Sequence, residues 1–302
     1  MLKHRTYSEV ADGDTSGMIE QVVGQAEKVA ERMKGVRACV AVMSGKGGVG
    51  KSLTTAGLAA ACAARGRRVG LLDADLVGAS AARMSGVNAA GLLVFEDRIE
   101  PAVSASGVKV MSMELLLEEG APLAWREPAS ESFVWRSAQE RTALREFVSD
   151  IDWGVLDLLI VDLPPGTQRL IDLAEMLPRL DGVIVLTIPS AASEAAVDRS
   201  MKLARDRGIP ILGVVENMAG YACETCGETR PLFPGNAGER LAERHAAPLL
   251  SRVAFDPAAA TLAEAGSLAA MLSSTDAGRA ISRTADELLD LLEGLEGLDE
   301  IV

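Results

Sequence analysis

The sequence predicts an α/β fold, a doubly wound and mostly parallel sheet with helices on both faces. Three observations support this class. Short apolar stretches alternate with longer amphipathic ones along most of the chain, which is the order of β–α–β units. Aromatic residues make up only 3% of the 302 residues, as suits helices packed closely on β-branched strands. With 48% hydrophobic residues, the chain can bury a substantial core.

The elements follow from the hydrophobic pattern. A polar segment and a helix over 18–33 form an N-terminal extension, residues 1–35. Apolar runs predict strands at 38–43, 69–73, 107–113, 156–162, 182–188 and 210–216. Helical periodicity predicts helices at 51–65, 137–149, 168–178 and 192–207. The segments 85–106 and 118–132 break this rhythm, so we expect them at an edge of the sheet or at its carboxyl end.

The pattern changes beyond residue 217. We expect a cysteine-containing loop at 221–235, then a helix at 236–245, a strand at 249–254 and a helix near 258–265. An acidic amphipathic helix ends the chain, and it is expected to pack through Leu288, Leu289 and Leu292. The chain thus divides into the extension, one domain over 36–270 and a C-terminal acidic helix within 271–302.

Charge and cysteine content narrow the function classes. The formal net charge of −13 argues against a nucleic-acid partner and against an anionic membrane surface. The N-terminus is too polar for a secretory signal and the chain has no run of eighteen apolar residues, so we expect a cytoplasmic protein. In that compartment thiols stay reduced, so a cysteine pair first suggests metal binding or redox chemistry.

A glycine-rich stretch, MSGKGGVGKS at 43–52, joins the first predicted strand to the next helix. It fits the phosphate-loop pattern G-x-x-x-x-G-K-[ST] in the strand–loop–helix context that makes the pattern specific. Lys51 is expected to reach the β- and γ-phosphates of ATP, and Ser52 to bind Mg²⁺. The residues predicted to contact the nucleotide are Gly45, Gly47, Gly48, Val49, Gly50, Lys51, Ser52 and Leu53.

Two further strands end in aspartate. They read LLDAD at 71–75 and LLIVDLPPG at 158–166. Because ligands bind at the carboxyl ends of parallel strands, Asp73, Asp75 and Asp162 are expected to converge on the glycine-rich loop. Magnesium prefers such oxygen ligands, so the sequence predicts a Mg·ATP site here.

Cys223 and Cys226 are two residues apart in a glycine-flanked loop, a spacing that lets both thiolates face one metal or cluster. Cys39 and Cys62 fall in a predicted strand and helix, where we expect ordinary core residues. One pair is half of a four-ligand site, and a second copy of the chain across a two-fold axis can supply the rest. An intersubunit zinc and a thioredoxin-like redox pair remain alternatives.

Four blocks together resemble the Mrp/ApbC family of iron–sulfur cluster carriers, which belongs to the deviant Walker A, MinD/ParA-like class of P-loop ATPases. They are SGKGGVGKS, VGLLDADLVGAS, LLIVDLPPGT and ILGVVENMAGYACETCGE, and the resemblance spans about 36–270. It implies that Lys46 reaches the nucleotide of a partner chain and that Asp75 positions the attacking water. It also implies that Asp73 and Asp162 hold magnesium through water and that Asn217 contacts adenine.

The resemblance further implies a homodimer that hydrolyses ATP slowly and holds one bridging [4Fe–4S] cluster through Cys223 and Cys226. Such a protein receives its cluster from a donor scaffold and delivers it to apo iron–sulfur proteins. The chain departs from the family at Gln168 and Arg169, where a glycine and an acid are usual, so the sequence leaves the rate of turnover open.

Two other classes share parts of this pattern. A ParA/MinD-like positioning or partition ATPase would bind DNA or membrane, which the acidic composition disfavours, and it has no use for the cysteine pair. A cluster-bearing reductase ATPase, such as the nitrogenase iron protein, has cluster cysteines far apart in sequence. The cluster carrier is therefore the function that we expect.

Overall fold

The computed structural model describes residues 18–299 except 77, 117–141, 143, 146, 167 and 223–227. The strands are β1 (Val36–Ser44), β2 (Val69–Asp73), β3 (Leu93–Val94), β4 (Ile99–Glu100), β5 (Ala102–Val103), β6 (Lys109–Ser112), β7 (Leu156–Asp162), β8 (Gly182–Thr187), β9 (Ile211–Ala222), β10 (Thr229–Arg230) and β11 (Leu249–Phe255). The main sheet has the order β10-β9-β8-β1-β7-β2-β6-β5, and β11 pairs with β9 outside that path.

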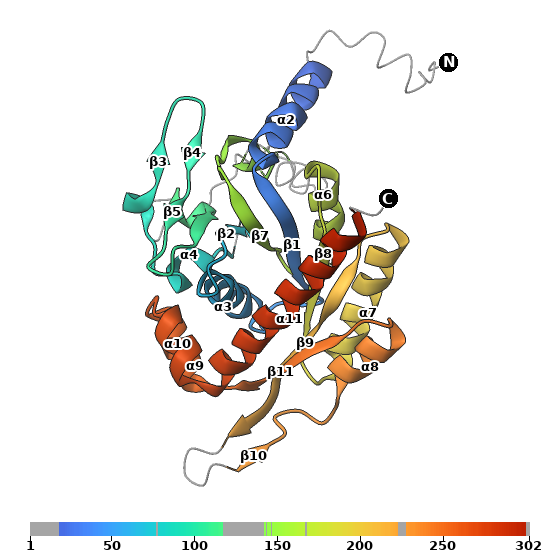
Figure 1. Cartoon of the computed structure of the whole chain (residues 1–302). Helices are drawn as coiled ribbons and strands as arrows, with labels where there is room; N and C mark the ends of the chain where they lie inside the picture. The colour runs from blue at the N-terminus through green and yellow to red at the C-terminus, as the bar shows by residue number, and fades with distance from the viewer. Residues whose placement is uncertain are drawn as a thin grey trace, which may run out of the picture.

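The inner strand pairs, from β2–β6 across to β8–β9, are parallel, and so is β9–β11. The antiparallel pairs of this sheet, β5–β6 and β9–β10, lie towards its edges. The helices are α2 (Met18–Met33), α3 (Lys51–Ala63), α4 (Ala81–Met84), α6 (Gln168–Met176), α7 (Ala191–Asp206), α8 (Ala237–Arg244), α9 (Pro257–Glu264), α10 (Leu268–Ser274) and α11 (Asp276–Asp299). They cover the sheet from two sides (Figure 1), which confirms the predicted fold class.

The central strand β1 shows why the fold has two cores. Val40 and Val42 face the layer that contains α3, α9, α10 and α11. Cys39, Ala41 and Met43 alternate with them and face the layer that contains α2, α6, α7 and α8. A parallel strand covered on both faces is expected to be an almost continuous apolar run, which is the pattern that predicted it.

The segment predicted as an excursion at 85–106 lies at the edge of the sheet, as expected. It forms the separate β3–β4 hairpin and then β5, which pairs with the edge of β6. The segment 118–132 and most of the predicted helix 137–149 lie outside the described residues.

The strand β9 is longer than the predicted 210–216. It continues to Ala222 and pairs there with β10. The first two residues of the predicted loop 221–235 therefore belong to β9, and the loop contains the short strand β10. The second half of the strand is not a continuous apolar run, because it contains Glu216, Asn217 and Gly220. The apolar pattern therefore predicted only its first half. Pairing with both β8 and β11 stabilises it nevertheless. The two cysteines of the C-x-x-C pair lie between β9 and β10, outside the described residues.

The last helix, α11, begins at Asp276 and lies within the predicted segment 271–302. The Thr275 hydroxyl accepts a hydrogen bond from the Gly278 N–H at 2.9 Å, which caps the helix start. Glycine disfavours helices, but Gly278 is needed near this start because a side chain here would collide with the Met271 carbonyl of α10. Leu288 and Leu292 are buried and Leu289 is partly buried, as the sequence predicts.

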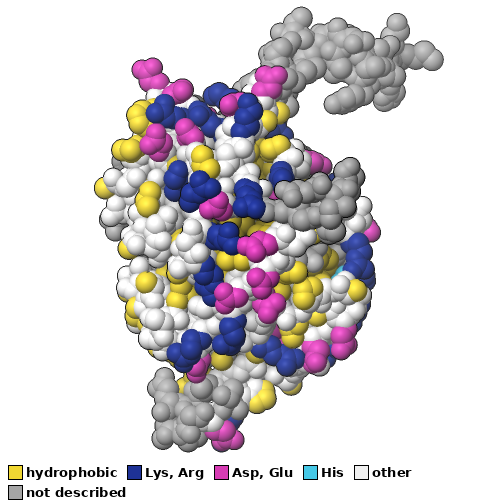
Figure 2. Space-filling view, in the orientation of Figure 1, with side chains coloured by type: hydrophobic (Ala, Val, Ile, Leu, Met, Phe, Trp, Pro, Cys, Tyr) yellow, Lys and Arg dark blue, Asp and Glu magenta, His cyan; other side chains and the backbone are white. Residues whose placement is uncertain are grey.

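Ion pairs supplement this packing of α11 on the end of α3. Arg65 binds Asp286, and Arg67 binds Glu293. On the face seen in Figure 2, basic and acidic side chains are interspersed over the area that α11 crosses in Figure 1. Among the described helices, none is both long enough and apolar enough to span a bilayer.

We predict that Leu288→Ala lowers the free energy of unfolding by about 2–5 kcal/mol, because it removes a fully buried side chain between α11 and the sheet. Urea denaturation of the full chain measures this. The matched control is Leu295→Ala on the same helix, where the side chain is 38% exposed and the change should stay within about 0.5 kcal/mol. Equal losses for the two variants would contradict the buried packing of α11.

Candidate nucleotide-binding site

The glycine-rich loop connects the end of β1 to the start of α3, as predicted. Gly50 precedes the helix with φ 80° and ψ 24°, a left-handed conformation that favours glycine. A side chain at this position would also collide with the amide of Asn217. The loop therefore delivers α3 with its free N–H groups and its partial positive charge directed at the carboxyl end of the sheet, which suits an anion.

Asp162, at the end of β7, gathers the first turn of α3. Its carboxylate accepts hydrogen bonds from Lys51 Nζ and from Ser52 Oγ, each at 2.6 Å, and from Thr55 Oγ1 at 2.9 Å. Asp162 is fully buried and Lys51 is only 8% exposed. The sequence predicted the meeting of Lys51, Ser52 and Asp162 but missed Thr55, which is one helical turn after Lys51 and so faces the same carboxylate.

Asp73 lies beside Asp162, because β2 and β7 pair with these two residues in register. Its carboxylate accepts hydrogen bonds from the N–H groups of Asp75, Ser80 and Ala81 at 2.9–3.1 Å. Burial, followed by the proximity of Asp162, raises the pKa of Asp73 to about 6. Asp73 thus shapes the segment that leads from β2 to α4, and the two carboxylates form the oxygen-rich pair that the sequence predicts for magnesium.

A cavity of about 450 Å³ opens above the glycine-rich loop. Lys46, Lys51 and Ser52 line it at one end, and half-buried Asp75 lies on the same wall. Asn217 also lines it and donates a hydrogen bond to the Val49 carbonyl at 2.8 Å. The structure therefore brings most of the predicted phosphate-contacting residues together with Ser52, Asp75 and Asn217 around one cavity, whereas Gly45, Asp73 and Asp162 are not among the residues that line it. The roles of these residues toward ATP stay predictions.

The other end of this cavity is more apolar, and the sequence did not identify its residues. It is lined by Met218 from β9, by Val253 and Phe255 from β11, and by Ala259 from α9. A predicted parallel strand at 249–254 could have indicated them, because its carboxyl end must reach the same edge of the sheet. The polar and the apolar ends together match a ligand with phosphates at one end and a flat base at the other.

Gln168 and Arg169, the two departures from the family pattern, both turn towards Asp172 in α6. Gln168 Nε2 donates to Asp172 Oδ1 at 3.3 Å, and an Arg169 nitrogen lies 3.7 Å from Asp172 Oδ2. Asp75 and Arg169 also line a second hollow of about 230 Å³ next to the main cavity. The unusual residues are thus placed beside the predicted catalytic segment.

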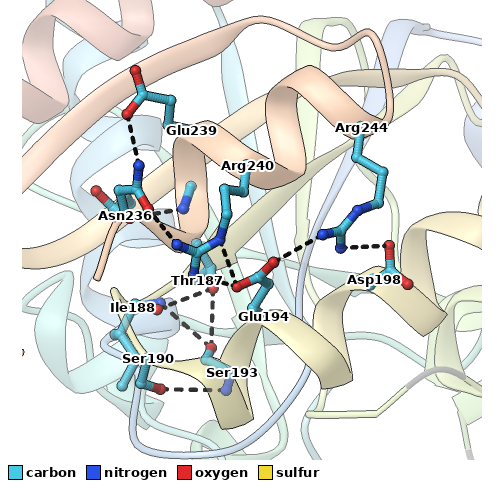
Figure 3. A network of polar contacts seen from close by, with 12 residues as sticks. Thr187, Ile188, Ser190, Ser193, Glu194, Asp198, Asn236, Glu239, Arg240 and Arg244 are labelled. Carbon is cyan, nitrogen blue, oxygen red and sulfur yellow. Dashed lines mark hydrogen bonds and ion pairs between the residues drawn. The ribbon is translucent and has the colours of Figure 1, made fainter. Parts of the chain in front are cut away.

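A polar network links α8, which follows β10 in the chain, to α7 and to the carboxyl end of β8 (Figure 3). Glu194 in α7 accepts hydrogen bonds from Arg240 and Arg244 in α8, and these bonds lower the pKa of its carboxyl group. Arg240 also binds Asn236, the residue that precedes α8. Ser190 caps α7 by accepting from the Ser193 N–H. The network fixes α8 on α7.

Two of the four cysteines, Cys39 and Cys62, are core residues, as the sequence predicts. Cys39 and Cys62 are at most 1% exposed, and burial raises the pKa of both thiols, for Cys62 to about 12. Buried thiols of this kind are poor metal ligands. Among the described residues no group of three or more His, Cys, Asp or Glu side chains has a metal-binding arrangement. Cys223 and Cys226 lie outside the described residues.

The strand–loop–helix geometry, the lysine and serine at the helix start and the buried aspartate opposite them define a P-loop NTPase. A sequence model of the family described as ParA, NUBPL iron-transfer P-loop NTPase, matches residues 35–289. The chain belongs to that family, which confirms the resemblance found in its motifs.

Characterised relatives agree with this assignment. The chain is 38% identical over 249 residues to an iron–sulfur cluster carrier protein of Saccharolobus solfataricus, with 82% of this chain and 81% of that protein covered. It is 35% identical to the cytosolic Fe-S cluster assembly factor NUBP2 of Homo sapiens, with 85% and 94% covered.

Solved structures share the fold. A nucleotide-binding protein of Archaeoglobus fulgidus in complex with ADP superposes with a TM-score of 0.67 at 31% identity, covering 80% of this chain and 92% of that one. The MinD cell division protein of Aquifex aeolicus gives a TM-score of 0.54 at 19% identity, with 84% and 97% covered. The second likeness concerns the fold alone.

We predict that Lys51→Ala weakens ADP binding at least about tenfold, because the phosphates lose a charged hydrogen-bond donor. The variant should also melt at a lower temperature, since it leaves the buried Asp162 carboxylate without its cation. Isothermal titration and thermal denaturation measure the two effects, and circular dichroism verifies that the sheet is retained. Lys46→Ala, in the same loop, is the matched control and should bind ADP as a single chain with nearly unchanged affinity. Unaltered ADP affinity in the Lys51 variant would contradict this site.

Proposed function

We propose that the protein is an ATP-dependent carrier that delivers iron–sulfur clusters to apoproteins. One observation carries the proposal: β9 lines the nucleotide cavity with Asn217 and Met218 and then leads directly into the C-x-x-C pair. A strand that lines a nucleotide site and is followed directly in sequence by a thiol pair suits a protein whose cargo is controlled by ATP. The names of its relatives, iron–sulfur cluster carriers and a cytosolic assembly factor, support the same function and a cytosolic setting. We assign both sites to the domain over 36–270, flanked by the segments 1–35 and 271–302.

The phosphate end of the cavity fits Mg·ATP in its donor chemistry. Lys51 and the N–H groups at the start of α3 would neutralise the phosphate oxygens. The Ser52 hydroxyl and the Asp162 carboxylate would hold magnesium, with Asp73 next to them, since this set offers only hard oxygen ligands. When bound, the metal ion screens the charge of the phosphates. Asn217, which also lines the cavity, would contact adenine.

Hydrolysis would be slow and would act as a switch. Asp75 is half-buried on the cavity wall, where its carboxylate could orient a water for attack on the γ-phosphate. Its Oδ1 already accepts a hydrogen bond from the Gly78 N–H at 2.9 Å, which fixes its direction. Lys46 would bind the nucleotide of the partner chain, so that nucleotide binding and dimerisation become one coupled event.

The cargo would be a [4Fe–4S] cluster shared by two chains. Each chain offers two suitable thiols, Cys223 and Cys226, because Cys39 and Cys62 are buried with raised pKa values. Two copies related by a two-fold axis complete four thiolate ligands. Ligands divided between two chains suit a cluster that is accepted from a donor scaffold and passed on.

We predict that anaerobically reconstituted protein holds about four irons per dimer, because two thiolates from each chain complete a four-cysteine site. Cys223→Ala and Cys226→Ala should each abolish the broad visible absorption of the cluster and its transfer to an apoprotein. Both variants should still bind ATP, since the glycine-rich loop is untouched. Iron analysis, visible spectroscopy and activation of an apo iron–sulfur protein measure these effects.

The matched controls for the cluster experiment are Cys39→Ala and Cys62→Ala, which should keep the cluster and lose only packing stability. Four irons bound to each monomer in dilute solution would exclude a bridging cluster. If protein purified anaerobically contained stoichiometric zinc and no iron, that result would contradict the cluster and favour an intersubunit zinc site.

We predict that Lys46→Ala weakens ATP-dependent dimerisation while it leaves nucleotide binding by one chain nearly intact, because the phosphate that Lys46 neutralises belongs to the partner. Analytical ultracentrifugation with and without ATP measures the dimer fraction. A dimer fraction equal to that of the unaltered protein would exclude the proposed role of Lys46.

A further inference from the structure

Strand β9 connects the nucleotide cavity to the hairpin that carries the two cysteines, and an aromatic contact links the same two places. Downstream of Asn217 and Met218, β9 reaches Tyr221, and it ends at Ala222. Ala222 pairs with Thr229 and Tyr221 pairs with Arg230, so the β9–β10 ladder holds both ends of the chain that carries the cysteines. The position of Tyr221 therefore sets the base of this hairpin.

A bulge separates the cavity-lining part of β9 from Tyr221. Val253 of β11 pairs with Asn217, and Phe255 pairs with Tyr221. Between these two pairs β9 advances by four residues and β11 by only two. Met218, in the bulge, has a φ of 53°, which is rare for a residue with a long side chain. Bulges bend a strand and redirect its side chains, and they are frequent next to functional sites. Here the bulge brings Met218 to the cavity and Tyr221 to Phe255.

Phe255 contacts both the cavity and Tyr221. It lines the apolar end of the nucleotide cavity, where its side chain is 39% exposed. Its ring centroid lies 6.2 Å from that of Tyr221 at an interplanar angle of 47°, a favourable aromatic contact. The Phe255 ring thus lines the part of the cavity that would hold a nucleobase and also contacts Tyr221 at the start of the hairpin.

The strand is firmly held upstream of the bulge. Glu216 Oε1 accepts a hydrogen bond from the Gly238 N–H at 2.7 Å, and Arg252 lies 3.2 Å from Glu216 Oε2. The same helix, α8, is fixed to α7 by the network around Glu194 (Figure 3). Because this frame is rigid, a change at the cavity can reach the hairpin through the bulge and the Phe255 ring.

We propose that Phe255 is a positioning residue through which a base bound in the cavity fixes Tyr221 and, with it, the hairpin that carries Cys223 and Cys226. The inference rests on the proposed function, since it concerns how the cargo thiols are controlled. In this proposal the coupling starts at the apolar end of the cavity, where the nucleobase would lie. The γ-phosphate would lie at the opposite end of the nucleotide. In a single chain, ADP should therefore act on the thiols as ATP does, whereas the proposed ATP switch acts through dimerisation.

The test measures the alkylation rate of Cys223 and Cys226 in the full, reduced, cluster-free chain at low protein concentration, with the label located by peptide mass spectrometry. Saturating ADP and saturating ATP, each with Mg²⁺, should slow alkylation by about fivefold or more. Phe255→Leu and Tyr221→Leu should lose this protection even when titration shows that their nucleotide sites are full. The buried thiols of Cys39 and Cys62 provide an internal reference that nucleotide leaves unchanged.

Phe95→Leu is the matched control, because Phe95 is a similarly exposed ring, at 43%, on the β3–β4 hairpin at the other edge of the sheet. It should keep the full protection. Protection by ATP but not by ADP would overturn the proposal, since the coupling would then start at the γ-phosphate. Full protection in nucleotide-saturated Phe255→Leu would overturn it as well. Neither result would bear on cluster carriage, which iron analysis and transfer test separately.

Discussion

The contact of Lys51 with Asp162 holds the nucleotide site together. Asp162 ends a central strand whose neighbours are β1 and β2, so its carboxylate has a fixed place relative to both the glycine-rich loop and Asp73. Lys51 begins α3, and the same carboxylate also binds Ser52 and Thr55. A buried ion pair is costly unless its remaining hydrogen-bonding groups are satisfied, and here the two hydroxyl groups satisfy the carboxylate. The first turn of α3 is thereby fixed over the sheet.

The strand β9 serves two purposes that place opposite demands on it. Upstream, it must be rigid, and Glu216 secures it to α8 and β11. Downstream, it leaves the regular ladder through the bulge at Met218 and pairs with β10. A fixed half and an irregular half in one strand are what the proposed coupling requires, because the cavity can then keep its shape while the hairpin changes position.

Local sequence patterns predicted the parts of the site that depend on short spacing. The glycine-rich loop, Lys51, Ser52 and the strand-terminal aspartates were found because strand–loop–helix order and the ends of parallel strands leave few alternatives. The bulge at Met218 and the contact of Tyr221 with Phe255 could not be predicted, because they depend on the register between β9 and β11. The close approach of Gly278, near the start of α11, to the Met271 carbonyl of α10 is likewise a tertiary requirement that no local pattern reveals.

The short β9–β10 pairing has a consequence for how the protein can change. The chain between Ala222 and Thr229 is inserted at two ladder pairs, Ala222 with Thr229 and Tyr221 with Arg230. Loop length has only a weak influence on folding free energy, so this insertion point tolerates replacement. A segment with other ligands or another spacing could be exchanged here without rebuilding the sheet. The fold is in this sense an adaptable scaffold, on which evolution or design can vary the cargo while the nucleotide machinery is inherited unchanged.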